Sequence, residues 1–150
     1  MADDLAEVEI VVRGGHPDFL DLPWGTPLAD WVHERIVAMA HGISRHVVRF
    51  VRYDHRVYAL KETERPRAEA EHRVLRLLRE DNLPCVEPVG LVRAPDTTGV
   101  AVLITRYLDY SLPYWYVIGR EAPTSTDVLL DAAVVLLVRL HLSGVFWGDC

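Results

Sequence analysis

Apolar and polar residues alternate along several short segments of this 150-residue chain. Alternation of this kind is typical of β-strands, because successive side chains point to opposite faces of a sheet. Short connections rich in Gly, Asp and Pro separate these segments, and such connections favour an antiparallel arrangement. The pattern predicts strands at residues 8–13, 46–53, 56–61, 86–93 and 100–107.

One segment combines helical spacing with clear start and stop signals. Pro66 suits the first helical turn, and Asn82 with the following Leu83-Pro84 predicts an end near residue 81. Glu71 shares one face of this helix with Val74, Leu75 and Leu78. We therefore expect the Glu71 carboxylate to point inward, where it needs a cation.

Two further helices are expected from the same periodicity. Thr26 and Pro27 suit a helix start, and apolar residues follow at the helical positions Leu28, Trp31, Val32 and Ile36. This helix either continues toward Gly42 or gives way to a strand from about Ile36, and we favour the strand. Residues 127–143 are apolar almost all round, which predicts a fully buried helix that Ser125 or Thr126 caps and Gly144 ends.

Composition excludes several classes of protein. The 22 acidic and 16 basic residues give a net charge of −6, which argues against a nucleic-acid-binding surface over the whole chain. Cys85 and Cys150 have no metal-ligand spacing and suggest a reducing cytoplasm. The apolar run 132–138 is too short to span a bilayer, and the acidic N-terminus does not resemble a signal peptide.

Lys61 is the only lysine in the chain. It ends a strand on which Val57, Ala59 and Lys61 share one face. An ammonium group there needs water or a fixed anion, and its compact charge suits phosphate oxygens in a confined site. A lone lysine among arginines is also compatible with chance. The position of Lys61 relative to Glu71 therefore decides between a phosphate-binding residue and an incidental one.

The order of elements and three motifs resemble the protein-kinase-like superfamily. Val57–Lys61 is similar to the third-strand V-A-I-K motif, and the helix with Glu71 is similar to the one that pairs with that lysine. Leu140–Asp149, reading LHLSGVFWGD, resembles the catalytic loop. Together with residues 105–114, the chain looks closest to an uncharacterised bacterial kinase-like family related to lipopolysaccharide-core and RIO-type kinases. The resemblance covers about residues 36–150.

This resemblance implies an α+β fold, with an antiparallel sheet and one Glu-bearing helix as the N-terminal lobe. Residues 1–35 would form an N-terminal extension, 36–110 the lobe, and 111–150 the incomplete start of the C-terminal lobe, with the remaining lobe as its partner. The resemblance also implies site residues. Lys61 would hold the phosphates of ATP with Glu71 fixing it, and Asp149 would be the catalytic base. The remaining ATP-binding positions would be Ala59 beside the adenine, Thr105 as gatekeeper, Arg106 and Leu108 as hinge, and Gly42, Ser44 and Arg45 in the phosphate-covering turn.

Three departures from the kinase pattern matter. The turn has a single glycine, Gly42, so fewer backbone amides can approach phosphates. Trp147-Gly148 precedes Asp149 in place of His-Arg. Downstream Asn and Asp metal ligands are absent, so no Mg²⁺ site is complete. We therefore expect an inactive fragment whose full-length parent uses ATP and Mg²⁺.

The sequence thus predicts the ATP-binding portion of a kinase-like phosphotransferase acting on an unknown hydroxyl-bearing acceptor. The alternative is a non-catalytic, pseudokinase-like module that senses nucleotide or binds protein, and the single glycine favours it. A third interpretation is an unrelated α+β interaction domain. We also expect the helix at 127–143 to expose apolar surface and to promote self-association.

Overall fold

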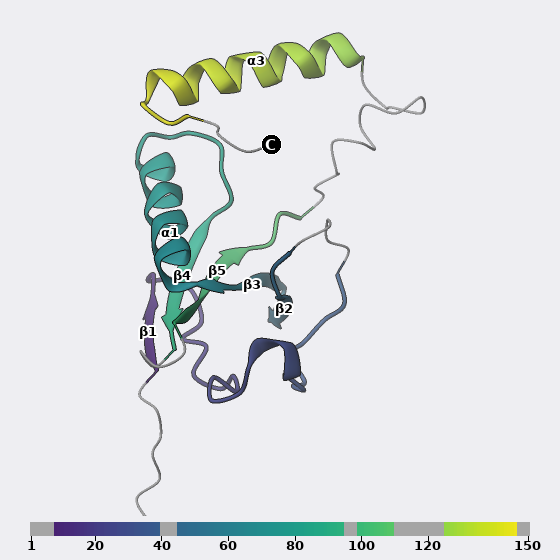
Figure 1. Cartoon of the computed structure of the whole chain (residues 1–150). Helices are drawn as coiled ribbons and strands as arrows, with labels where there is room; N and C mark the ends of the chain where they lie inside the picture. Colours follow the sequence, from purple (N-terminus) through teal and green to yellow (C-terminus); the bar gives the residue numbers. More distant parts are fainter. Residues whose placement is uncertain (1–7, 40–44, 95–98, 110–124, 147–150) are drawn as a thin grey trace, which may run out of the picture. The chain divides into compact units, whose positions relative to one another are not determined.

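The computed structural model describes residues 8–39, 45–94, 99–109 and 125–146. It contains an antiparallel sheet and two α-helices, an α+β arrangement that confirms the expected kinase-like N-terminal lobe with its Glu-bearing helix (Figure 1). Its elements are β1 (Glu9–Val12), a 3-10 turn at Leu28–Asp30, β2 (Val48–Tyr53), β3 (Arg56–Glu64), α1 (Arg65–Glu80), β4 (Pro88–Arg93), β5 (Val100–Arg106) and α3 (Thr126–Leu142).

The five strands form one antiparallel sheet in the order β1-β4-β5-β3-β2. Asp54, at a positive φ of 53°, turns the chain between β2 and β3. The predicted hairpin of β4 and β5 is confirmed, with Arg93 opposite Ala101 beside the turn. β1 pairs with the free edge of β4, so the N-terminal residues belong to the same sheet as the predicted lobe.

The described residues divide into two compact units. The first comprises the residues up to Leu77 together with 86–107, and it holds the whole sheet. The second comprises residues 78–85 and the described residues from Leu108 onward, with α3. The expected boundaries at residues 35/36 and 110/111 stay a prediction.

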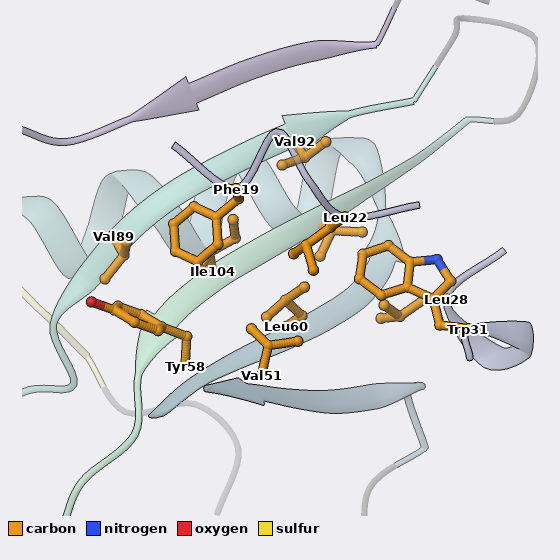
Figure 2. Close-up of a cluster of buried hydrophobic side chains, with 11 residues drawn as sticks. Phe19, Leu22, Leu28, Trp31, Val51, Tyr58, Leu60, Val89, Val92 and Ile104 are labelled. Carbon is orange, nitrogen blue, oxygen red and sulfur yellow. The ribbon is translucent and has the colours of Figure 1, made fainter. Parts of the chain in front are cut away.

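The main core lies on one face of the sheet, under the segment between β1 and β2. Figure 2 shows Phe19, Leu22, Leu28 and Trp31 from that segment packed on strand residues. Each of these four residues is 0–5% exposed to solvent. The strand residues of this cluster are Val51, Tyr58, Leu60, Val89, Val92, Val102 and Ile104. Burial of this cluster stabilises the first unit, because removal of apolar area from water is the dominant favourable term in folding.

Helix α1 packs on the opposite face of the sheet. Ala68 of the helix clusters with Leu91 and Ala101 of the strands, and all three are almost completely buried. The helix ends at Glu80, close to the expected residue 81, and Asn82 beyond it adopts a positive φ of 54°. The amide of Leu83 then donates to the Leu78 carbonyl at 2.8 Å, the bond typical of a Schellman motif.

The predicted helix starting at Thr26 and Pro27 is wrong, because the structure has only a short 3-10 turn there. Arg49 of β2 contacts this turn: its guanidinium donates to the Leu28 carbonyl at 3.1 Å and also to the Ala29 carbonyl. These contacts tie the turn to the sheet, an influence from about twenty residues away that local periodicity does not register. The strand favoured from Ile36 is reduced to one antiparallel bridge with Val51.

The prediction of a fully buried helix at residues 127–143 is also wrong. α3 forms, and Gly144 ends it at a positive φ of 78°. Ser125 occupies the N-cap position without a capping side-chain hydrogen bond. Only Leu140 of the helix is buried, whereas Val134 and Val135 are 57% and 58% exposed. An apolar helix is buried only where other residues cover it, and those the structure describes leave most of α3 uncovered.

Candidate functional site

Lys61 and Glu71 form the ion pair that the sequence predicts. The Lys61 Nζ atom donates to both carboxylate oxygens of Glu71, at 2.9 and 2.7 Å. Both side chains belong to the first unit and are about one-third exposed, at 30% and 36%. An ammonium group has three N–H donors, so a two-oxygen contact leaves one of them for an anion that approaches from solvent.

The register of the sheet places Lys61 at this position. Lys61 lies between Val48 of β2 and Leu103 of β5, its Cα partners on either side. Because α1 follows β3 directly, the second helical turn returns over the strand and brings Glu71 to the ammonium group. The carboxylate therefore fixes the lysine without help from a residue distant in the sequence.

A strip of apolar side chains continues from Lys61 along the same face of the sheet. Ala59 is partly buried and lies between Phe50 of β2 and Thr105 of β5 in the register. Val57 extends the strip and is 8% exposed. Phe50 makes an edge contact with the ring of Tyr107, with centroids 5.6 Å apart. This face thus presents an ammonium group at one end and apolar surface beside it.

The predicted hinge residues are only partly available for a ligand. The Arg106 amide donates to the Glu87 carbonyl at 3.0 Å, so this N–H is already used within the sheet. The Arg106 side chain lies 3.7 Å from a Glu87 carboxylate oxygen. Leu108 is 49% exposed. The Arg106 amide is therefore not available to a ligand that would hydrogen-bond to this segment.

Other predicted site residues lie outside the described part of the chain. These are Gly42, Ser44 and the expected base Asp149. Arg45 is described and exposed to solvent. The structure thus brings together Lys61, Glu71, Ala59 and Thr105 on one face.

Sequence reasoning missed a second network of charges on α1. The Glu69 carboxylate accepts from Arg93 of β4 at 2.7 Å and from Arg65 at 3.4 Å. Arg93 in turn lies 3.1 Å from Glu9 of β1. The hydrogen bond from Arg93 is the largest influence on Glu69 and lowers the pKa of its carboxyl group. No local pattern signals this network, because its members come from three separate elements.

Two negative findings apply to the residues that the structure describes. Among them, no three His, Cys, Asp or Glu side chains gather in a way that could hold a metal ion. No helix within the described ranges is both long and apolar enough to cross a bilayer.

Comparison with known proteins assigns the family. No curated protein and no solved structure gives a significant match to this chain. The family model described as APH, phosphotransferase enzyme family, matches residues 35–145, which contain both members of the ion pair. That match covers well over half of the sequence. This chain therefore belongs to the APH phosphotransferase family, a part of the protein-kinase-like superfamily.

Proposed function

We propose that this chain binds ATP, with Lys61 as the residue that contacts its phosphates. The observation that carries the proposal is the two-oxygen ion pair between Lys61 and Glu71. In the superfamily, a paired lysine of this kind neutralises phosphate charge during phosphoryl transfer. The family match supports a kinase-like phosphotransfer domain, and the acceptor would be a hydroxyl group.

The residues of the strip fit a nucleotide at this face. A purine is flat and largely apolar, so the small Ala59 side chain leaves room for it beside Thr105. The Arg106 carbonyl and Leu108 would recognise the edge of the base, while Gly42, Ser44 and Arg45 would cover the phosphates. ATP, when bound, would supply the transferable γ-phosphoryl group, and Asp149 would accept the proton of the acceptor hydroxyl.

We further propose that this chain by itself binds nucleotide without transferring phosphate. The alternative, a pseudokinase-like module, is favoured by the single glycine of the predicted turn. The narrower relationship to lipopolysaccharide-core and RIO-type kinases, and a cytoplasmic location, belong to the same proposal.

Thermal unfolding in ATP and magnesium chloride tests the nucleotide site. Ligand at about 100 times its dissociation constant stabilises the folded state by about 2.7 kcal/mol, so the melting temperature of the wild type should rise. Lys61→Met should lower ATP affinity at least about tenfold, as expected when a charge-assisted contact worth about 1.5–3 kcal/mol is lost.

Arg67→Met is the matched control, because Arg67 is an exposed basic residue of α1 and loses the same unit of charge. It should leave ATP affinity unchanged. A wild-type melting temperature that ignores saturating ATP would refute the proposal, as would equal ATP affinity in Lys61→Met. If ATP binds, an assay of phosphate transfer to water and to simple alcohols separates an active enzyme from the pseudokinase alternative.

A further inference from the structure

The face of β3 opposite Lys61 is covered by residues 16–31, which we call the N-terminal strap. Leu60 and Glu62 flank Lys61 in the sequence and point to that opposite face. Leu60 is fully buried in the cluster with Leu22, Leu28 and Trp31 (Figure 2). The strand that carries the lysine is thus held by α1 through Glu71 on one face and by the strap on the other.

Two polar side chains tie the strap to the sheet at Leu28. The Leu28 amide donates to the Glu62 carboxylate at 3.3 Å. The Leu28 carbonyl accepts from the Arg49 guanidinium at 3.1 Å, and that guanidinium also reaches the Ala29 carbonyl. Arg49 lies directly opposite Leu60 in the β2–β3 register. The Leu28 amide is therefore bound by one sequence neighbour of Lys61, Glu62. The Leu28 carbonyl is bound by Arg49, the cross-strand partner of the other neighbour, Leu60.

The strap lies outside the region that defines the family, since the family match begins at residue 35. Its apolar side chains are nevertheless among the most buried in the first unit, with Phe19 at 0% and Leu28 at 1%. A segment buried to this degree acts on the strand that it covers, because packed cores transmit displacement instead of absorbing it.

We propose that the N-terminal strap positions Lys61, through the contacts of Glu62 and Arg49 with Leu28. Glu62 and Arg49 are positioning residues, since their side chains contact the strap and act on the lysine only through it. Loss of the Glu62 acceptor leaves the Leu28 amide unpaired in a partly buried place, so the end of β3 relaxes. The lysine then leaves its two-oxygen geometry with Glu71.

The sole lysine makes this proposal measurable without any nucleotide. An amine-reactive acetylating ester modifies Lys61 at a rate that falls when the ammonium group is held by Glu71, and mass spectrometry of the Lys61 peptide reports that rate. Glu62→Ala should raise it about fivefold, the equivalent of about 1 kcal/mol for one hydrogen bond. Glu62→Gln keeps an acceptor oxygen and should return the rate to within about twofold of the wild type.

Glu64→Ala is the matched control, because Glu64 is an exposed carboxylate further along the same strand. It should acetylate at the wild-type rate. Arg49→Met serves where Glu62→Ala fails to fold, and it should give a rate about twofold higher than the wild type. Wild-type rates in a folded Glu62→Ala or Arg49→Met protein would overturn the proposal, and so would a Glu62→Gln rate equal to that of Glu62→Ala.

The consequence for ligand binding rests on the function proposed above. Calorimetry with ATP and with adenosine should show that Glu62→Ala weakens ATP about fivefold while adenosine affinity is unchanged, because only the phosphates contact Lys61. A wild type that binds neither ligand refutes the nucleotide function and leaves the acetylation result standing. A variant that weakens both ligands equally shows general loss of structure and overturns the positioning role.

Discussion

The ammonium group of Lys61 bridges both carboxylate oxygens of Glu71, at 2.9 and 2.7 Å, across the space between β3 and α1. About one-third of each side chain is exposed, so solvent screens the pair. An ion pair in this setting contributes little to folding.

Removal of the ion pair should therefore change stability only slightly. A double-mutant cycle with Lys61→Met and Glu71→Gln should give a coupling free energy below about 1 kcal/mol, because exposed pairs typically lie in that range. Urea unfolding of the four proteins measures it. A coupling free energy of several kcal/mol would show that the pair is chiefly a structural element.

Gly90 of β4 should tolerate no side chain. A Cβ atom there would lie 2.7 Å from the Val11 carbonyl oxygen and 3.3 Å from a Val12 methyl carbon of β1. Gly90→Ala should therefore push β1 from the sheet edge and cost about 1–3 kcal/mol. Hydrogen exchange of residues 9–12 and the melting temperature report the change.

Gly25→Ala provides the comparison for Gly90, since a Cβ at Gly25 meets no atom within 4 Å. Its melting temperature and the exchange of β1 amides should match those of the wild type. If the β1 amides of Gly90→Ala exchange as slowly as those of the wild type, the sheet edge adapts to the added methyl group and the prediction is wrong.

Glu69 should make stability depend on pH in the acid range. The hydrogen bond from Arg93 lowers the pKa of its carboxyl group below the ordinary value of 4.5. A carboxyl group with a depressed folded-state pKa stabilises fully above its unfolded value. The contribution is then lost as pH falls from about 4.5 through the folded pKa. Urea unfolding from pH 7 to 3 should show a shallower loss of stability in Glu69→Gln than in the wild type.

At pH 7 the Glu69→Gln protein should be less stable than the wild type, because Arg93 and Arg65 lose their shared carboxylate. Glu64→Gln changes a carboxylate with greater exposure on β3 and should leave stability at pH 7 unchanged. If the free energy of unfolding falls with pH equally in the wild type and in Glu69→Gln, the low pKa does not arise from this network.

Helix α3 should promote self-association of the chain. Val134, Val135 and Val138 are 57%, 58% and 50% exposed, and contiguous apolar surface of this kind is typical of contact sites. Light scattering at rising concentration should show species larger than a monomer, and Val135→Glu should reduce them. A monodisperse monomer at high concentration would contradict the prediction.

The sequence by itself determined the strands, helix α1 and the pairing of Lys61 with Glu71. Strand alternation, the helical face of Glu71 and the end signals at Asn82 and Gly144 are local properties, because each depends on residues within a few positions. The lysine and its partner lie ten residues apart on consecutive elements, so their meeting required no knowledge of the wider fold.

The tertiary structure alone decided the features that depend on distant residues. Arg49 donates to the carbonyls of Leu28 and Ala29, about twenty residues earlier, where local spacing favours a helix and the structure has a short 3-10 turn. β1 finds its partner in β4, and Glu69 finds Arg93 in the same strand. Periodicity indicates which face of an element is apolar, but not which element covers that face. The position of the strap, the pairing of β1 with β4 and the exposure of α3 therefore follow only from tertiary packing.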